Sequence, residues 1–462
     1  MRLQAGPGFQ LPELDQVAEG VRAGPGDQRR LESVYFDTPD LRLARWGVSL
    51  HHQSGGEWTL TLPETALTFS GSPRNPPRDA TDLVSAYVRG SALAAVARLS
   101  TLRRRVTLLG AAGRQLAEVV EDEVSVLQRR RVAARFREVE VDVASEGDGL
   151  REPLLSRLRL AGAGMAEALP TFLQALGPVA QEPPEVAPQP LPRDPSAAQV
   201  VTRALALSAL AVLRHDPGVR LGSDPEDVHQ ARVGTRRLRS NLRTFRSLLV
   251  PEWADGLREE LGWLATELGA VRDGEVLLER LRAHTERLPA SDRRLGLATA
   301  GQLEGSIAES RATLLEAMRS QRYVDLLERL VAAANRPELA AVAAEPADKV
   351  LPQLARKPWR RLRAAVQALP EDPPDPDLHA CRIRAKRARY AAEAVAPASG
   401  RDAERFARAA AKLQTVLGDH QDSVVAQSWL RAHAGRGRRA FVAGEMAALE
   451  LTLAESSRQA WP

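Results

Sequence analysis

The segment from His229 to Arg239 reads HQARVGTRRLR, and the segment from His379 to Arg389 reads HACRIRAKRAR. Both place a basic residue at the third, seventh, eighth and tenth positions after the histidine. On a helix, which turns about 100° per residue, the histidine and the third, seventh and tenth positions lie within about 80° of one another. The pattern therefore predicts a positive stripe along a helix, and it predicts that stripe twice.

Neither stripe contains the acidic side chains that usually accompany a charged helix face. No Asp or Glu occurs from His229 to Val250 or from Cys381 to Ala392. A solvated helix normally interleaves acids about four residues from its bases, which relieves the repulsion between like charges. A stripe without acids repels itself and offers many hydrogen-bond donors, so its simplest explanation is a polyanion bound along it.

The stripes belong to a longer internal repeat. Leu268-Gly269 lies 39 residues after the first histidine and is followed by Asp273, while Leu417-Gly418 lies 38 residues after the second and is followed by Asp422. We expect two copies of one helical unit, with a turn at each Leu-Gly pair. Each aspartate is expected either to orient a basic side chain or to cap that turn.

The ends and faces of the stripe helices are also set by sequence. Asp224-Pro225 and Asp375-Pro376 are typical helix starts. Opposite the arginines of the first stripe lies an apolar face that we expect to be packed, formed by Leu238, Leu242, Phe245 and Leu249.

Bulk composition limits the class of protein. A chain of 462 residues exceeds what one core usually supports, so we expect two domains. The 64 basic and 59 acidic residues leave a net charge of only +5, and all but four of the bases are arginine, so basicity is local. Cys381 is the only cysteine, which excludes a disulfide framework within one chain. No apolar run approaches the roughly 18 residues of a membrane span, and we expect a cytoplasmic protein without membrane partners.

The chain divides at a proline-rich segment, residues 177–195, which contains seven prolines and is expected to be a semi-extended linker. Residues 1–176 contain short β-like runs between Gly and Pro turns, and residues 196–462 contain long Ala/Leu/Arg/Glu stretches. The expected fold class is α+β multidomain, with an antiparallel β-barrel-like domain before an all-α pseudo-twofold bundle. The halves of that bundle are expected at about 196–335 and 345–462.

The two stripes, with both Leu-Gly segments and their aspartates, resemble the motifs of CHAD domains, the conserved-histidine α-helical domains. The resemblance covers the chain from about Pro195 to its end and implies two pseudo-symmetric helical bundles whose basic helices form a cavity for inorganic polyphosphate, with no cofactor required. It implies ligand contacts from His229, Arg232, Arg236, Arg237, Arg239, Arg243, His379, Arg382, Lys386, Arg387 and Arg389.

Nucleic acid is the competing polyanion. Binding of single strands normally adds aromatic platforms for base stacking, and the basic helices contain only Phe245 and Tyr390. A linear phosphate chain offers repeated charge without base edges, and its affinity should fall with salt because counterions are released. We therefore place polyphosphate before nucleic acid, and expect a cytoplasmic protein associated with polyphosphate granules.

The N-terminal region resembles CYTH domains, the triphosphate-tunnel enzymes. The segments Tyr35 to Pro39, Trp58 to Leu62, Thr101 to Arg105 and Arg137 to Asp142 follow one another in that order. The resemblance implies an antiparallel barrel in which Arg103 and Arg105 contact phosphate, while Glu138, Glu140 and Asp122 bind Mg²⁺ or Mn²⁺. Strand alternation by itself places Glu138, Glu140 and Asp142 on one face.

Several positions depart from the CYTH pattern. No Glu-x-Glu-x-Lys strand precedes Arg2-Leu3, which indicates either a shortened barrel or a start codon placed too far downstream. His51 and Gln53 replace an expected basic pair, and Pro63 replaces an expected lysine. Phosphoryl transfer depends on positioning and electrostatics, so we expect little or no triphosphatase activity. The alternative is metal-dependent hydrolysis of triphosphate or short polyphosphate in this domain, which alone would require Mg²⁺ or Mn²⁺.

Overall fold

The computed structural model describes the chain from Met1 to Pro462 except residues 7, 111–112, 129–130, 165–168 and 461–462. The chain forms two compact units, an N-terminal unit from Met1 to Glu185 and a C-terminal unit from Val186 to Pro462. The division falls inside the proline-rich segment 177–195. Each unit has its own core and is described separately.

The described residues of the N-terminal unit form one antiparallel sheet of ten strands, in the order β10-β1-β9-β8-β7-β3-β4-β5-β6, with β2 also paired to β7. The expected antiparallel sheet domain is confirmed. The pairings of the described strands do not join β6 to β10, so hydrogen bonds leave the sheet open. The strands are β1 Arg2–Ala5, β2 Arg22–Ala23, β3 Asp27–Asp37, β4 Ser49–Gln53, β5 Trp58–Leu62, β6 Thr65–Phe69, β7 Ala94–Leu109, β8 Gln115–Gln128, β9 Arg131–Val143 and β10 Ala163–Gly164.

The first described strand lies close to the predicted carboxylates. Residues Arg2–Ala5 form β1, which pairs with both β9 and β10. In this register Arg2 lies opposite Glu140 and Gln4 opposite Glu138. The residues of β1 next to the two glutamates are therefore Arg and Gln.

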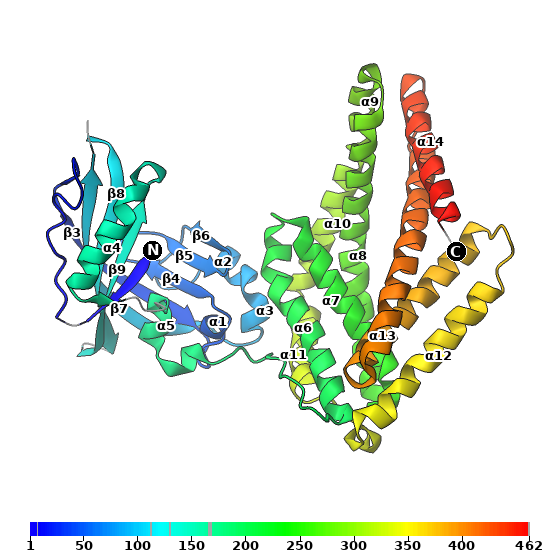
Figure 1. The fold of residues 1–462 in the computed structure, drawn as a ribbon, viewed down its shortest axis with the longest axis horizontal. Coiled ribbons are helices and arrows are strands. Elements are labelled where there is room, and N and C mark those ends of the chain that lie inside the picture. The colour runs from blue at the N-terminus through cyan, green and yellow to red at the C-terminus, as the bar shows by residue number, and fades with distance from the viewer. Residues whose placement is uncertain (7, 111–112, 129–130, 165–168, 461–462) are drawn as a thin grey trace. The chain divides into compact units, whose positions relative to one another are not determined.

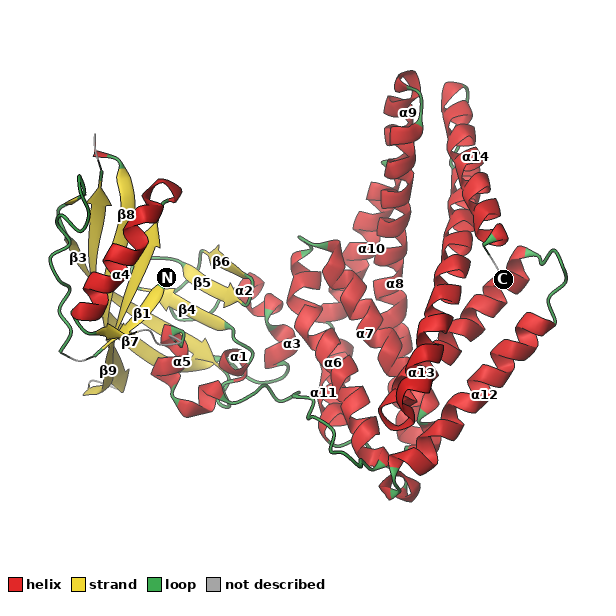
Figure 2. Cartoon of the chain, in the orientation of Figure 1, coloured by secondary structure: helices red, strands yellow, loops and turns green. Residues whose placement is uncertain are grey.

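Helix α4 (Arg151–Leu160) covers one face of this sheet (Figure 2). Its Leu154 and Leu158 are fully buried and pack with Leu3, Val119 and Val139 from β1, β8 and β9. The odd-numbered residues of β9 therefore face the core, which leaves the even-numbered carboxylates of that strand on the opposite face. The remaining helices are α1 Arg42–Arg45, α2 Arg78–Leu83, α3 Ser85–Val88 and α5 Thr171–Leu176.

The first half of the proline-rich segment is packed, although a semi-extended linker was expected. A 3₁₀ turn spans Pro178–Gln181, and Ala180 is buried with Phe172 and Ala44. Glu185 accepts hydrogen bonds from Arg89 at 2.6 Å and from the Trp46 indole at 3.1 Å. Side-chain contacts that proline spacing does not encode therefore anchor this segment to the N-terminal unit.

The described part of the C-terminal unit is helical, as expected. The two predicted Leu-Gly turns are wrong, because both pairs lie within long helices, Leu268-Gly269 in α8 and Leu417-Gly418 in α13. Helix α13 is interrupted instead at Gly400, whose φ of 64° suits glycine. The helices are α6 Ala197–Leu221, α7 Pro225–Thr244, α8 Pro251–Arg287, α9 Ala290–Ala300, α10 Gln302–Arg319, α11 Gln321–Asn335, α12 Ala347–Gln367, α13 Asp375–Ala432 and α14 Arg438–Gln459.

The two stripe helices begin differently. Asp224 caps α7 as predicted, because its side chain accepts a hydrogen bond from the Glu226 amide at 2.8 Å. In α13 the capping position is Pro374, which has no side-chain cap. Asp375 instead pairs with Arg458 and lies 3.2 Å from His420.

A reciprocal pair of hydrogen bonds joins the starts of the two halves. The Ala197 amide donates to the Glu345 carbonyl at 2.9 Å, and the Ala347 amide donates to the Pro195 carbonyl at 3.0 Å. The equivalent residues are 150 positions apart, as are His229 and His379. A pseudo-twofold axis requires such an exchange. This axis relates α6 to α12, and α7 to the first part of α13.

The apolar face of the first stripe helix is buried, as predicted. Leu238, Leu242, Phe245 and Leu249 are each at most 1% exposed. Helix α6, against which α7 packs, is long and apolar enough to cross a membrane by length and composition, although no run of that kind was expected. Half of its most apolar window is buried inside the unit, as in the core helix of a bundle.

The C-terminal unit also contains two long arms, one from α8, α9 and α10 and one from the second part of α13 with α14 (Figure 1). An apolar cluster that includes Leu281, Leu430 and Met446 joins them. Beside it, fully buried Glu450 accepts two hydrogen bonds from Arg280, at 2.6 and 2.7 Å, and lies 2.6 Å from His284. Burial alone would raise the pKa of Glu450, but the His284 and Arg280 hydrogen bonds lower it to about 2.

Replacing Glu450 with Gln should reduce the free energy of unfolding by about 3 kcal/mol at pH 7, because Arg280 would lose its buried carboxylate. A carboxyl with a lowered folded pKa stabilises the protein above its unfolded pKa and loses that effect as pH falls towards the folded value. Wild-type stability should therefore drop between about pH 4.5 and pH 2, and the variant should lack most of that drop. Urea unfolding across this range measures both effects, with Glu304→Gln, an exposed carboxylate paired to Arg282, as the control. Equal losses in the two variants would contradict the assignment.

Candidate anion-binding site

Four basic side chains gather where α7 meets the first part of α13. They are Arg232 and Arg236 of the first stripe with Arg382 and Lys386 of the second, and we call them the central basic cluster. They occupy the third and seventh positions after each histidine, so the pseudo-twofold axis relates one pair to the other. Arg236, Arg382 and Arg232 all act on the charge of Lys386, which places the four groups around one region.

Lys386 is the most strongly perturbed base of this cluster. Burial, and then repulsion from Arg236 and Arg382, lower its pKa to about 7. Asp273 is the acid that acts against these effects, and it already pairs with Arg232, so the four bases have less counter-charge than buried cations normally have. The cluster is therefore electrostatically unsatisfied in the free protein.

Tyr390 links the two halves at this junction. Its hydroxyl accepts a hydrogen bond from Arg236 Nε at 2.7 Å, and the guanidinium groups of Arg236 and Arg389 lie 5.8 and 5.7 Å from its ring centre. Tyr390 is only 6% exposed, so its ring is not a surface platform. It holds Arg236 in place by a neutral contact that leaves the positive charge intact.

The two Leu-Gly segments contribute helix surface beneath the arginines. A Cβ at Gly269 would lie 3.9 Å from Arg232 Nε, and one at Gly418 would lie 3.8 Å from Arg382 Nε. Each arginine therefore lies against the helix surface at the glycine, at a distance that would also admit an alanine side chain. Asp273 pairs with Arg232 at 2.9 Å, which fits the expected orienting role.

Asp422 holds the equivalent position in the second half. Burial raises the pKa of its carboxyl, against the lowering effects of Arg382 and Arg280. Arg382 Nε is buried and has no hydrogen-bond partner among the described residues, and the same is true of Arg272 Nε. Buried donors of this kind are costly unless a ligand or water satisfies them.

The two motif histidines have different partners. The residue three positions after each glycine lies near the histidine, Arg272 in the first half and Gln421 in the second. His379 Nδ1 lies 2.7 Å from Gln421 Oε1. Burial lowers the pKa of His229, and Arg272 lowers it further. Glu226 acts on His229 in the opposite direction and raises its pKa, so His229 lies between an acid and arginines, whereas His379 contacts a neutral amide.

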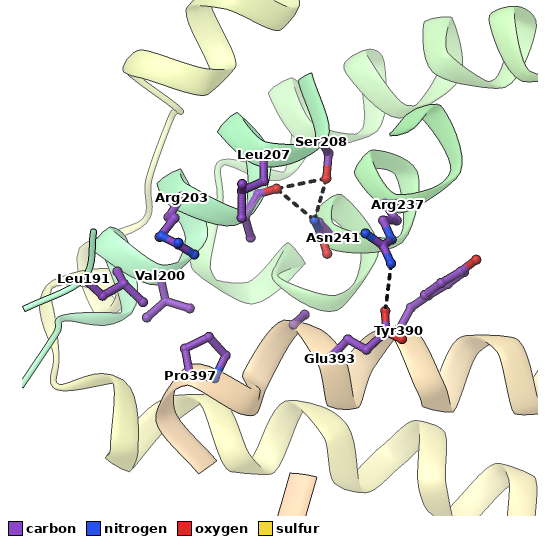
Figure 3. A pocket seen from close by; sticks show the side chains of 12 residues that line it. Leu191, Val200, Arg203, Leu207, Ser208, Arg237, Asn241, Tyr390, Glu393 and Pro397 are labelled. Atoms are coloured by element: carbon purple, nitrogen blue, oxygen red, sulfur yellow. Dashed lines mark hydrogen bonds and ion pairs between the residues drawn. The ribbon is translucent and has the colours of Figure 1, made fainter. Parts of the chain in front are cut away.

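The arginines at the eighth position after each histidine, Arg237 and Arg387, lie in two different pockets beside the stripes. Arg237 lies 3.9 Å from Glu393, which also accepts a hydrogen bond from Arg389 at 2.7 Å. Arg237 and Glu393 line a pocket of about 340 Å³ against α6, which we call the α6 pocket (Figure 3). Glu393 stands just beyond the acid-free run of α13, and it neutralises part of the predicted positive surface.

Arg387, the other eighth-position residue, lines a larger pocket of about 980 Å³ against α12, the α12 pocket. Arg243 lines the same pocket, and burial together with the nearby Arg387 lowers its pKa. Arg239 points elsewhere, beside Arg258 in a pocket on α8 that also contains Asp255 and Glu259. The structure therefore does not bring all eleven predicted contacts to one surface.

Sequence reasoning missed the basic side chains of α12. Lys357 and Arg361 line the α12 pocket, together with Arg384 and Arg246. The signal was present, because Arg356 to Arg363 contains five bases and no acid. It lacks the histidine register of the two stripes, so the repeat did not reveal it.

Each predicted tunnel residue of the N-terminal unit has a partner within the protein. Arg103 donates two hydrogen bonds to Asp122, at 2.8 and 2.7 Å. Glu138 accepts hydrogen bonds from Thr171 at 2.7 Å and from Gln174 at 2.8 Å. Arg105 lies 3.5 Å from Glu118, and Glu140 lies 3.9 Å from Arg2.

The register places Asp122 beside Glu138 and on the same sheet face as Glu140. Their oxygens are nevertheless engaged by different partners. Among the described residues, no group of three or more His, Cys, Asp or Glu side chains is placed to hold a metal ion. The physical reason is that Arg103 and the α5 side chains occupy the oxygens that a cation would need.

Comparison with known families agrees with the helical part of this description. Residues 203–431 match the family described as CHAD domain. Two sequences from Mycobacterium tuberculosis, uncharacterized protein Rv2226 of strain H37Rv and uncharacterized protein MT2285 of strain CDC 1551, are each 33% identical to this chain. The match spans 97% of this chain and 91% of each relative.

Two solved structures resemble the chain over about the extent of the C-terminal unit. PptA from Streptomyces chartreusis is 27% identical, with a TM-score of 0.49, covering 58% of this chain and 98% of that one. The CHAD domain from the plant Ricinus communis is 26% identical, with a TM-score of 0.46, covering 60% of this chain and 96% of that one.

Replacing Lys386 with Met should stabilise the free protein by about 1–2 kcal/mol at pH 6, because it removes a desolvated charge from among three arginines. The unfolded lysine titrates near 10.5 and the folded one near 7, so the cost is complete below pH 7 and disappears as pH rises to about 10.5. The difference in the free energy of unfolding between the variant and wild type should therefore shrink between pH 7 and about pH 10.5. Urea unfolding at pH 6, 7.5 and 9 measures it, with the exposed Lys412→Met as the control. A variant less stable than wild type at pH 6 would overturn this interpretation.

Proposed function

This chain belongs to the CHAD domain family, and from that premise we propose that it binds inorganic polyphosphate at the central basic cluster. Phosphoryl groups of the polymer add counter-charge around Arg232, Arg236, Arg382 and Lys386, beyond what Asp273 supplies to Arg232. The flanking bases of both stripes hold the neighbouring phosphates. No metal or cofactor takes part in this binding.

The observation that carries the proposal is that Arg232, Arg236, Arg382 and Lys386 gather at one junction of α7 and α13, where burial and the neighbouring arginines lower the pKa of Lys386. The unpartnered Arg382 Nε supports it. Functional sites commonly keep such strain because the ligand relieves it. A linear polyanion with one charge per unit relieves it at several points simultaneously.

Polyphosphate suits this site better than nucleic acid does. Single-stranded nucleic acid binds largely by stacking its bases on exposed aromatic rings. Phe245 is fully buried and Tyr390 is 6% exposed and engaged with Arg236, so the basic helices offer no such platform among their described residues. Recognition then rests on charge and spacing alone.

Reversing charge at Arg236 or Lys386, by substitution with Glu, should lower the affinity for long-chain polyphosphate by at least about tenfold. Titration calorimetry at low and moderate salt measures the loss. Arg287→Glu and Arg294→Glu make the same change in net charge on the α8–α9 arm and should leave affinity within about twofold of wild type. Unchanged binding in the central variants would sink the proposal, as would single-stranded DNA competing equally at the same charge concentration.

We further propose that the N-terminal unit is a CYTH-like domain without catalytic function. The pairing of Arg103 with Asp122, and of Glu138 with Thr171 and Gln174, supports this proposal, because phosphate and metal would have to displace those partners. Arg2, which lies 3.9 Å from Glu140, also reduces the negative charge available to a cation.

Purified protein should release no phosphate from triphosphate above background in Mg²⁺ or Mn²⁺, since the carboxylates are already engaged. A malachite-green phosphate assay with and without chelator measures this. Metal-dependent release that Glu138→Gln abolishes would instead establish the enzymatic alternative.

A further inference from the structure

The α12 pocket is strongly basic. Six cations line it, and no acid stands among its described lining residues; the cations are Arg243, Arg246, Lys357, Arg361, Arg384 and Arg387. Arg246 is held by Asp255 at 2.7 Å, whereas the other five have no ion-pair partner among the described residues. Hydroxyl donors accompany them, from Ser240, Thr244 and Ser247.

The α6 pocket is its counterpart, because the pseudo-twofold axis relates α6 to α12. Its character is different. Leu191, Val200, Leu207 and Pro397 make its lining largely apolar, and Glu393 faces its Arg237 (Figure 3). The fold thus offers two related openings beside the stripes, one partly neutralised, with Arg203, Arg237 and Glu393 in its lining, and one with six cations and no acid among its described lining residues.

We propose that the α12 pocket is a phosphoryl-binding compartment that extends the central basic cluster on one side only. A condensed phosphate chain held at the central cluster continues under α12 and does not continue under α6. This inference rests on the proposed function and adds α12 to the binding surface.

The pocket and the central basic cluster are built on the same two stripe helices. On α7, Arg243 follows Arg236 by seven residues, a rise of about 10 Å along the helix. On α13, Arg387 directly follows Lys386. Arg387 lies near enough to Arg243 to lower its pKa, after the larger effect of burial. A polymer held at the central basic cluster therefore has further cations within reach along both helices.

The side chains suit phosphoryl oxygens. Guanidinium groups donate paired hydrogen bonds to phosphate, and hydroxyl groups donate to the oxygens that remain. Lys357 and Arg361 are four residues apart on α12, so they project from the same helix face into the pocket. Since their charges are not matched by protein carboxylates, an added anion would complete the arrangement.

The test compares two double variants of α12. Lys357→Gln with Arg361→Gln removes two pocket charges, and Arg356→Gln with Arg360→Gln removes two charges of the same helix that lie outside the pocket. For long-chain inorganic polyphosphate the pocket variant should bind about tenfold or more weakly, with a shallower salt dependence, by about 1 to 2 in the log–log slope. The outer variant should stay within about twofold of wild type.

Tripolyphosphate distinguishes an extension from a separate site. It is short enough to stay at the central basic cluster, so the pocket variant should bind it as the outer variant does. Equal losses of long-chain affinity in the two α12 variants would overturn the inference, and so would a loss for tripolyphosphate as large as the loss for long chains. If wild type binds no polyphosphate, the proposed function itself fails. If the Arg236 and Lys386 variants lose binding while the two α12 double variants bind long chains with equal affinity, only the proposed extension into the α12 pocket fails.

Glu393→Gln tests why the extension is one-sided. Removing this carboxylate frees Arg237 and Arg389, so long-chain affinity should rise and the salt dependence should steepen. Glu404→Gln, which removes an exposed charge paired with Arg408 on the same α13, is the matched control. A Glu393 variant that binds no better than this control would contradict the account of the neutralised side.

Discussion

The C-terminal unit depends on one electrostatic constraint, the mutual repulsion of four basic side chains at the junction of its two halves. Arg232, Arg236, Arg382 and Lys386 meet there because buried apolar faces fix α7 and α13, and because reciprocal hydrogen bonds fix the two halves at their starts. The apolar packing of the helices opposes this repulsion. The result is a site held ready for an anion, in which the lowered pKa of Lys386 records the cost.

The two units use arginine in opposite ways. On the sheet of the N-terminal unit, Arg103 meets Asp122 in register, so the charges cancel within the protein. At the central basic cluster the protein supplies fewer carboxylates than cations, and Asp273 is the one that forms a close ion pair there among the described residues. A surface whose charges cancel internally offers little to a phosphate, whereas an incompletely paired one gains from binding it.

The sequence predicted the parts of this architecture that follow from periodicity. The β-like runs, the long helices, the apolar face of α7 and the repeat of the histidine register were all readable from spacing. The sequence wrongly placed turns at the two Leu-Gly pairs, because in a local pattern a glycine inside a helix resembles a glycine at a turn. The stripes contain no acid in sequence, as predicted. In the fold, however, Asp273 and Glu393, which lie outside those runs, pair with stripe arginines. Pairing across helices depends on tertiary position, and a single sequence without an alignment does not encode that position in a local pattern.

The most direct test of the central claim is a calorimetric titration of the intact protein with inorganic polyphosphates of graded chain length at two salt concentrations. Binding should strengthen with chain length until the cations of both stripes are matched, and it should weaken steeply with salt because counterions are released. Binding that is absent, or that depends on neither length nor salt, would contradict the account.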